Sequence, residues 1–575
     1  MRSRRTKCLV IASLMLAGPH PRSRITLHSS PSASSVASRP RVLPPRPHSQ
    51  ITRHSRPSAA QVHAIHRIPS VPDALVNRAV TLRSGIGLAH DTVATSSKDA
   101  QAFYDQGLAY MHSFMWVEAA RSFNQALRAD AGLATAHLGL TVAYTELNAP
   151  AKARVALERA QALGKSTPAH DRAHIEARAL QMAAEANPGD RSRLTNYRSA
   201  LDRAVAAYPK DVELLLLRGV AESPDPADRG QGSPASAAPF FEKALMLVPG
   251  HFASHHYLTH ALENVGRASL ALPHAAAYAK AAPSVPHALH MHGHVLRRVG
   301  RIDEAVALFE AADRLETAYF KTENVAAEHE WHYEHNLELL ASSYRYQGRM
   351  TKAEGLLETA FGVPSSLVVQ MVNKHGWPAF LISRGRTAEA LAAASVLVGH
   401  PSGLVRAAGH IETGHAQLAA GRFQAAAEAA NAALAELKAA PDGAALVGPA
   451  FEALQGAFFV RTKQQEKGRA MLQGVARRLR QAPGPDAWVR ALFALESMGR
   501  VAREAGDWTT AAWAASEMAA HDPNFAGTHY ALGLVAEHNG DARAARSAFA
   551  LAERHWPAAD PGLPELVAVR QRTRR

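Results

Sequence analysis

The stretch "HMHGHVLRRVGRIDEAVALFEAADRLE", residues 290–316, consists of two short amphipathic segments joined by a glycine. Gly293 and Ala305 are small residues at corresponding places in the two segments, and Phe309 follows Ala305 one helical turn later. Gly300 lies between the segments, where glycine lets the chain turn. The stretch therefore predicts two helices that cross closely at their small residues and bury their large ones.

The same pattern recurs along the chain. A small residue and four further small or apolar residues stand at offsets 0, 3, 12, 16 and 19 in four stretches, which begin at Gly107, Gly293, Gly499 and Gly533. This pattern is similar to the tetratricopeptide repeat, a helix pair of about 34 residues. One pair cannot bury its own apolar face, so repeats must stack. The sequence predicts an all-α, right-handed tetratricopeptide-type solenoid of about ten or eleven helix pairs.

The beginning of the chain differs from the rest. Residues 1–18 combine a basic start, "MRSRRTK", with a short apolar run, "CLVIASLMLAG", as a signal peptide does. Residues 19–90 are rich in Pro, Ser and Arg and predict a disordered linker. The solenoid is expected over residues 91–575, with a break near 320–333 or 441–449 as an alternative to one continuous array.

The signal-like segment predicts export, to the periplasm or outside the cell. A transit peptide is an alternative, because the segment is rich in Arg and Ser and poor in acids. A start codon assigned too early is another, and it would make the protein cytoplasmic. No other stretch approaches 18 consecutive apolar residues, so no transmembrane helix is predicted in the mature chain.

Charge and motifs exclude several functions. The net charge of +14 comes mainly from residues 1–90, which hold 14 Lys+Arg and one acid. The remaining residues hold 50 Lys+Arg and 49 Asp+Glu and are nearly neutral. A neutral body argues against a nucleic-acid-binding protein. The only cysteine, Cys8, excludes cysteine-based zinc sites in the body. "LGKSTP" and "HEWHY" each lack a required residue of the phosphate-loop and zinc-protease motifs, and the sequence offers no enzyme motif of high specificity.

Histidines gather in residues 251–335, which hold 12 of the chain's 31. Two successive repeats place His256 and His290 at position 5, and His260 and His294 at position 9. A spacing of four puts each pair on one helical face. The 34-residue interval puts the two pairs on neighbouring parallel helices, so all four imidazoles are predicted to converge on the concave groove of the array.

Further polar side chains fall on groove positions of neighbouring repeats: His287, His335, Glu338, His375 and His415. Imidazoles with a carboxylate within reach suit a divalent metal such as zinc, iron or copper. The metal ligands would be His256, His260, His290 and His294, with Glu263, Glu334 or Glu338 orienting a ring. Two other roles stay open, since groove histidines also contact peptides and neutral imidazoles also pack against one another.

Two parts of the sequence carry a resemblance. They are "ATSSKDAQAFYDQGLAYMHSFMWVEAARSFNQAL", residues 94–127, and the pair "PGHFASHHYLTHALE" and "HALHMHGHVLRRVGR", residues 249–263 and 287–301. The chain resembles a group of large, mostly uncharacterised bacterial tetratricopeptide proteins that carry HYxxH and HMxxH segments. The resemblance extends over most of residues 90–360, and departs from the group's pattern at Phe252 and Trp116. It implies the fold and no established reaction.

The sequence therefore favours a non-enzymatic scaffold that binds a peptide or protein segment in its concave groove. The alternative is a metal-binding protein or metalloenzyme that uses the histidines of residues 256–338. No cofactor other than such a metal is expected, and no nucleic acid.

Overall fold

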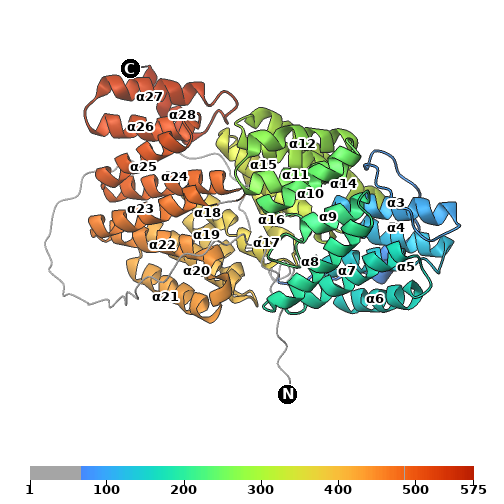
Figure 1. Ribbon diagram of the computed structural model, residues 1–575. Helices are drawn as coiled ribbons and strands as arrows, with labels where there is room; N and C mark the ends of the chain where they lie inside the picture. Colours follow the sequence, from blue (N-terminus) through green and yellow to red (C-terminus); the bar gives the residue numbers. More distant parts are fainter. Residues whose placement is uncertain (1–65, 483, 485, 575) are drawn as a thin grey trace.

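The computed structural model describes residues 66–482, 484 and 486–574, and the regular secondary structure of that part is helical throughout (Figure 1). The signal-like segment, residues 1–18, and residues 19–65 of the predicted linker lie outside the described residues. Among the described helices, none is both long and apolar enough to cross a bilayer.

Successive helices pack as pairs, an A helix followed by a B helix, and each pair contacts the next. The first seven pairs are α3 (Lys98–His112) with α4 (Trp116–Ala129), α5 (Ala134–Glu146) with α6 (Pro150–Gly164), α7 (Ala169–Glu185) with α8 (Arg191–Ala207), α9 (Val212–Val220) with α10 (Ala238–Leu247), α11 (Phe252–Asn264) with α12 (Ala268–Ala281), α13 (Pro286–Arg298) with α14 (Ile302–Glu323), and α15 (Trp331–Tyr346) with α16 (Met350–Gly362). Figure 1 shows these pairs together on one side of the molecule.

The later pairs lie on the other side (Figure 1). They are α18 (Gly376–Ser383) with α19 (Thr387–Val398), α20 (Gly403–Ala419) with α21 (Phe423–Ala439), α22 (Ala444–Arg461) with α23 (Gln465–Gln481), α24 (Ala487–Ala505) with α25 (Trp508–His521), and α26 (Ala526–His538) with α27 (Ala542–Arg554). Single helices stand at either end and in the middle: α2 (Asp73–Val76), α17 (Val368–Asn373) and α28 (Pro564–Thr573). The predicted all-α solenoid is confirmed, with twelve pairs in the described part against the ten or eleven expected.

The small repeat positions lie at close helix crossings, as the sequence predicts. A Cβ atom added to Gly107 would come within 2.5 Å of the Phe123 ring, and one added to Gly533 within 2.4 Å of the Phe549 ring. Real side chains do not approach so closely, so glycine is needed where these phenylalanines of the B helices press against the A helices. This contact repeats along the array and sets the distance between the helices of a pair.

Residues 320–333 and 441–449 are the two places where the sequence allows a break in the array. One apolar cluster includes Leu296 and Phe380 and therefore continues across residues 320–333. Another includes Met371 and Leu454 and continues across residues 441–449. The helix α14 itself extends to Glu323, where Asn324 ends it in a left-handed conformation with φ of 47°. Side-chain packing is therefore continuous at both positions.

The chain before the first repeat is packed against the array, and we call residues 66–97 the N-terminal strap. Leu75, Val76 and Ile86 of the strap are buried in the same apolar cluster as α3 and α11. Gly85 has φ of 75°, and its carbonyl accepts a hydrogen bond from the Ser284 backbone N–H at 2.8 Å. A left-handed conformation without a Cβ atom lets the strap pass this close to the loop before α13.

The strap corrects the domain boundary expected from composition. The composition places residues 66–90 in a disordered linker, but Leu75, Val76 and Ile86 within this stretch are buried, while other apolar residues of the stretch are exposed. Polar contacts hold the strap as well: Gln106 accepts a hydrogen bond from the Arg83 backbone N–H at 2.7 Å and donates one to the Thr81 carbonyl at 3.2 Å. The packed part of the chain therefore begins before residue 90.

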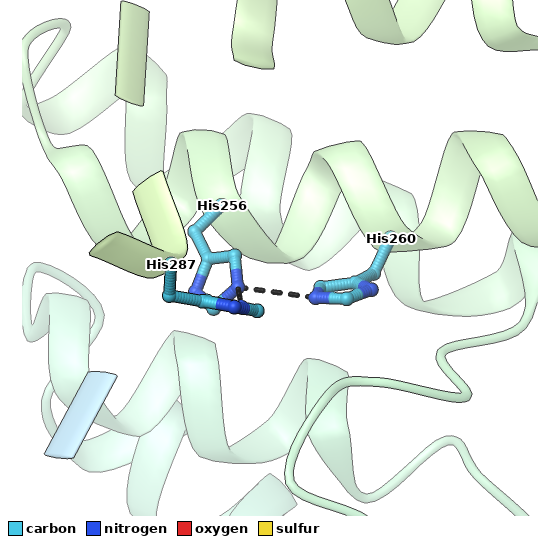
Figure 2. Close-up of side chains that lie close together, drawn as sticks. All are labelled: His256, His260 and His287. Atoms are coloured by element: carbon cyan, nitrogen blue, oxygen red, sulfur yellow. Dashed lines mark hydrogen bonds between the residues drawn. The ribbon is translucent and has the colours of Figure 1, made fainter. Parts of the chain in front are cut away.

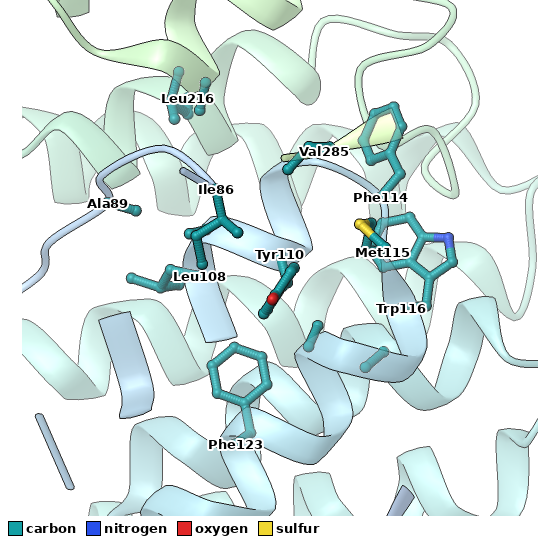
Figure 3. Close-up of a cluster of buried hydrophobic side chains, with 14 of the residues drawn as sticks. Ile86, Ala89, Leu108, Tyr110, Phe114, Met115, Trp116, Phe123, Leu216 and Val285 are labelled. Atoms are coloured by element: carbon teal, nitrogen blue, oxygen red, sulfur yellow. The ribbon is translucent and has the colours of Figure 1, made fainter. Parts of the chain in front are cut away.

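The turn between α3 and α4 is unusual among the helix-pair turns. Its residue Phe114 takes the place that Gly300 and Gly540 hold in other repeats, and it keeps their left-handed conformation, with φ of 59°. Non-glycine residues rarely adopt this conformation. The Phe114 side chain is completely buried, next to Met115 and Trp116 (Figure 3). The first repeat thus inserts an aromatic ring at a position that is glycine in most other repeats and Asn148 or Lys463 in two of them.

Candidate functional site

Three of the histidines singled out by the sequence meet in the interior, and we call them the histidine cluster: His256 and His260 of α11, and His287 of α13. The Nε2 atom of His256 lies 3.1 Å from that of His260 and 3.0 Å from that of His287 (Figure 2). The ligating nitrogens of all three lie within 4.8 Å of one another. The 34-residue repeat interval therefore does bring imidazoles of neighbouring A helices together.

The tautomer of His256 follows from its other nitrogen. Its Nδ1 lies 2.7 Å from the backbone carbonyl of His112. A carbonyl oxygen only accepts, so Nδ1 must carry the proton and donate it. Burial holds the pKa of His256 well below its usual range, with the His260 imidazole adding to the effect. The ring is neutral, and its Nε2 presents a lone pair to the other two rings.

The other cluster rings are held neutral in the same way. Burial lowers the pKa of His260 to about 3 and holds the pKa of His287 well below the usual range. The His332 ring of α15 stacks on His287 with ring centroids 4.2 Å apart, and its pKa is also far below the usual range because it is buried. Desolvation favours the neutral form of every ring here, and neutral imidazole is the form that binds metals.

The remaining two predicted metal ligands do not join the cluster. The Nδ1 of His290 lies 3.1 Å from Oδ1 of Asn336, and its ring lies beside His335 with centroids 5.0 Å apart. The Nδ1 of His294 donates to Oε1 of Glu263 at 2.9 Å. The prediction that four histidines converge is therefore wrong: two of them converge, and His287, predicted only as a groove residue, supplies the third ring.

His294 belongs to a separate group with His335 and Asp486, whose ligating atoms lie within 4.8 Å of one another. Burial works against protonation of His294, but Glu263 and Asp486 outweigh it and raise the pKa of His294 to about 9. Arg297 already pairs with Asp486 at 2.8 Å. A guanidinium at this distance neutralises the carboxylate, so this group is an ion-pair network rather than a metal site.

The predicted open groove is absent from this part of the array because the first repeat fills it. The Phe114 ring lies 4.7 Å from the His256 ring and 5.2 Å from the His287 ring, centroid to centroid. It also stacks on His332 at 6.3 Å with an angle of 18° between the planes. His256 is 0% exposed, so this ring lies in the core and does not line an open groove.

Two residues of the site escaped the sequence analysis. His112, at the end of α3, anchors His256 and places its own Nε2 2.7 Å from Glu213 and its Nδ1 2.8 Å from the Tyr257 hydroxyl. His332 stacks on His287. His112 lies 144 residues from His256 in sequence, so no local spacing connects them. The sequence signal for this buried site is Phe114, which stands at a turn position where Gly300 and Gly540 stand in other repeats.

Three predicted groove residues lie elsewhere. Glu338 is buried beside Glu334 and Lys374, and burial raises its pKa well above the usual range. Glu334, named as an orienting partner, instead forms an ion pair with Lys374 at 2.9 Å. Neither carboxylate reaches the histidine cluster with a hydrogen bond among the described contacts. His375 and His415 lie in the later repeats.

Those later repeats do form a hollow on their A helices, which we call the C-terminal hollow. It is lined by residues of the A helices α18, α20, α22 and α24: Ala379, Ile382, Glu412, His415, Leu418, Ala419, Arg461, Ser497, Arg500, Val501 and Glu504. His375 donates from Nδ1 to Oε1 of Glu412 at 3.0 Å, and 39% of its side chain is exposed. Two predicted groove positions thus fall in or beside a hollow.

The histidine cluster fits a divalent cation in ligand type and spacing. In a tetrahedral zinc site with bonds of about 2.0–2.1 Å, ligating nitrogens lie about 3.3 Å apart. The two shortest Nε2 separations, 3.0 and 3.1 Å, are close to this value. The His256 Nδ1–carbonyl contact is the usual orienting partner of a ligating ring. The buried Nδ1 of His287 has no hydrogen-bond partner within the described part of the chain. Of the three rings, His287 therefore lacks a partner that would fix its orientation for a metal ion.

Two family models of the tetratricopeptide repeat match the chain, one at residues 286–319 and one at residues 497–564. With the paired helices above, they support a large protein built on tetratricopeptide repeats. The likeness of its HYLTH and HMHGH segments to one bacterial group stays an expectation. A search among curated proteins finds no match.

Several solved structures match parts of the chain. The human IFIT1 dimer with PPP-AAAA is 14% identical, covers 73% of this chain and 90% of its own, and has a TM-score of 0.37. MamA 41-end from Desulfovibrio magneticus RS-1 is 18% identical, covers 32% and 93%, and has a TM-score of 0.25. The Cut9-Hcn1 hetero-tetramer of APC/C is 11% identical, covers 82% and 96%, and has a TM-score of 0.26. At these scores the likeness carries no argument about function.

Tetratricopeptide arrays expose extended concave surfaces to protein partners. The repeats therefore support a protein-interaction scaffold as the coarse function of this chain.

Proposed function

We propose that the protein holds a peptide segment of a partner protein in the C-terminal hollow. The observation that carries this proposal is that four consecutive A helices line one hollow with both apolar and charged side chains. Ile382, Leu418 and Val501 offer apolar contacts to a peptide side chain. A segment laid across four repeats would contact each of them in turn, as a peptide in a solenoid groove does.

The charged groups of the hollow favour a peptide that carries a carboxylate. Arg461 pairs with Glu504 at 3.1 Å, and Arg500 lies 3.9 Å from the same carboxylate. The Arg500 guanidinium also donates to the Ser497 hydroxyl at 3.5 Å. Burial lowers the pKa of Arg500. A guanidinium has five N–H donors, and these two long contacts leave most of them without a partner of their own. Arg500 can therefore bind a ligand carboxylate through two parallel hydrogen bonds, in bidentate geometry.

The test is selection of peptides from a random displayed library on the full chain, followed by affinity measurements. We expect the selected peptides to be enriched in Asp or Glu next to apolar residues. Arg500→Gln should weaken their binding at least tenfold, because it removes the cation and keeps much of the side-chain volume. Arg478→Gln is the matched control, since Arg478 lies on the outer helix α23 and pairs with Glu452 of α22. Equal binding by wild type and Arg500→Gln would refute the proposal.

A second candidate function is metal binding at the histidine cluster, favoured by the three converging Nε2 atoms. The cation would be zinc, iron(II) or copper(II), held by His256, His260 and His287. Titration calorimetry with each metal on wild type and on His256→Ala/His287→Ala tests it. The control is His290→Ala/His294→Ala, which removes two equally buried rings outside the cluster. If both double variants bind metal alike, the cluster is a packed set of neutral imidazoles.

A further inference from the structure

A third group of potential ligands lies where the strap meets α7 and α9, and the proposed function makes no use of it. Asp91 of the strap meets His170 and His174 of α7, and their ligating atoms lie within 4.8 Å of one another. Asp211, the N-cap residue of α9, reaches the same two rings. Three separate elements of the chain thus contribute two imidazoles and two carboxylates to one place.

The carboxylates of Asp91 and Asp211 both approach the Nε2 atoms of the two rings. Oδ2 of Asp211 lies 2.7 Å from Nε2 of His170 and 3.3 Å from Nε2 of His174. The Asp91 oxygens lie 3.6 Å from Nε2 of His170 and 3.9 Å from Nε2 of His174. Both rings present the same nitrogen, because their spacing of four residues places them on one face of α7.

Neighbouring groups hold two of these potential ligands, His170 and Asp211, in position. The Nδ1 of His170 lies 3.1 Å from Oδ1 of Asp171, whose other oxygen accepts the Ala94 backbone N–H at 3.2 Å. The Leu214 backbone N–H donates to Oδ1 of Asp211 at 3.0 Å and leaves Oδ2 for the rings. A carboxylate on the far nitrogen of a ligating histidine and a hydrogen-bonded ligating carboxylate are the usual surroundings of a metal site.

The Asp91 carboxylate is the observation that points to a ligand. Its side chain is only 9% exposed, yet among the described contacts it makes no hydrogen bond. Its nearest polar partners are the two Nε2 atoms, which lie beyond hydrogen-bond distance. Ligating atoms around a tetrahedral zinc ion are separated by about 3.3 Å. A small cation between Asp91 and the rings would satisfy a buried carboxylate that otherwise has no direct partner there.

We propose that Asp91, His170, His174 and Asp211 form a binding site for a divalent transition-metal cation that fastens the N-terminal strap to α7 and α9. Two imidazole nitrogens and two carboxylate oxygens are a ligand set that suits zinc, manganese or iron(II). A divalent cation also balances the two carboxylate charges. Protons on both imidazoles would balance them equally well, so the experiment must separate a metal from protons.

The experiment measures zinc in the full chain after exhaustive dialysis and then its zinc affinity by calorimetry. We expect His170→Ala/His174→Ala to lose one equivalent of zinc relative to wild type, and Asp91→Asn to bind zinc at least tenfold more weakly. His529→Ala/His555→Ala is the matched control, because these two rings stack with centroids 5.1 Å apart on the last repeats. The control should keep the wild-type zinc content and affinity.

Zinc content and affinity that are unchanged in folded His170→Ala/His174→Ala would overturn the proposal and leave an ion-pair cluster. A zinc loss of the same size in the control pair would also overturn it, because it would indicate adventitious surface binding. If the double variant does not fold, the zinc affinity of Asp91→Asn provides the test, since this substitution keeps the shape of the side chain. Zinc affinity equal to that of wild type would then overturn the proposal. Binding of zinc at this site is independent of peptide binding in the C-terminal hollow, so either proposal can fail alone.

A second readout follows from the position of Asp91 in the strap. Zinc should slow proteolytic cleavage of residues 66–97 in wild type, because the cation would tie the strap to two helices of the array. It should have no such effect in Asp91→Asn. Protection by zinc in both proteins would show that the cation acts elsewhere and would refute the fastening role.

Discussion

Position 5 of a repeat is histidine in both halves of the molecule, at His256 and at His375, and the two side chains have opposite surroundings. His256 is completely buried between the Phe114 turn and neighbouring imidazoles. His375 is 39% exposed and lies beside the C-terminal hollow. The repeat frame assigns the same face to both residues. Whether that face is a groove or a core depends on what other parts of the chain cover it.

The cover of the N-terminal half comes from two segments, the strap and the α3–α4 turn. Neither belongs to the regular repeat pattern in this region: the strap precedes the repeats, and Phe114 replaces a turn glycine. Most of the later repeats keep glycines at the corresponding turns, among them Gly421, Gly506 and Gly540, and Lys463 takes this place between α22 and α23. The comparison therefore predicts that removing the cover should affect the N-terminal half and leave the C-terminal half unchanged.

Removing the strap should have the largest effect. A chain that begins at residue 98 exposes the surfaces that Leu75, Val76 and Ile86 cover. Each buried side chain of this size stabilises by about 1.5–3 kcal/mol, so the free energy of unfolding should fall by roughly 5 kcal/mol. Hydrogen exchange should accelerate in α3, α11 and α13 and stay unchanged in α20 to α27. The matched control is a chain that begins at residue 66, and equal exchange in both chains would contradict the prediction.

Phe114→Ala should have the next largest effect. The ring is completely buried, and truncation of such a phenylalanine typically costs about 3–5 kcal/mol. The backbone at φ of 59° remains unfavourable for alanine, so no strain is released in compensation. Urea unfolding measures the loss. Phe423→Ala is the control, since Phe423 is 39% exposed at the start of α21 and should cost far less.

The fold could be predicted from the sequence because each helix pair is specified locally. Gly293 and Phe309 meet within one repeat, and their spacing alone signals a close crossing. The site could be predicted only in part. His256, His260 and His287 come together through neighbouring repeats, but their cover comes from His112 and Phe114 of the first repeat. Contacts between distant repeats leave no periodic signal in a single sequence, so the burial of these rings was not predictable.

The strap shows the same limit. The Pro-, Ser- and Arg-rich composition of residues 19–90 indicates disorder, while the packing of the strap rests on a few residues such as Val76 and Ile86. Asp91 likewise carries no motif, because its partners His170 and Asp211 lie on helices that only the tertiary fold brings to it. The i,i+4 pair His170 and His174 was the one signal available.

The stability of the N-terminal half should fall in mild acid. An unfolded imidazole titrates near 6.5, whereas burial lowers the pKa of folded His260 to about 3. The stabilisation from such a ring is complete above pH 6.5 and is lost as the pH falls toward 3, by up to about 2 kcal/mol between pH 6.5 and 5. Urea unfolding of wild type and His260→Gln at pH 7.5 and 5 measures the loss. The variant should lose less stability on acidification than wild type does.

His294 provides a second test, because its pKa is raised on folding whereas the pKa of His260 is lowered. Glu263 and Asp486 overcome burial and raise the pKa of His294 to about 9. Its contribution is complete below pH 6.5 and is lost as the pH rises through 9. His294→Gln should therefore reduce the loss of stability between pH 7.5 and 9.5. Identical pH profiles for wild type, His260→Gln and His294→Gln would contradict the assignment of both rings.

The smallest effect is expected for His375→Ala, the counterpart of the buried His256. Its ring is partly exposed, and its hydrogen bond to Glu412 is the polar contact that truncation removes. One such bond contributes about 1 kcal/mol, so the free energy of unfolding should fall by roughly that amount. His256→Ala should cost several times more, because it removes a ring packed 4.7 Å from Phe114 and 4.5 Å from Tyr278 together with the bond to His112. Urea unfolding of the two variants side by side measures the difference. Equal losses would mean that the same repeat position is equally buried in both halves, and the contrast between a filled and an open groove would have to be abandoned.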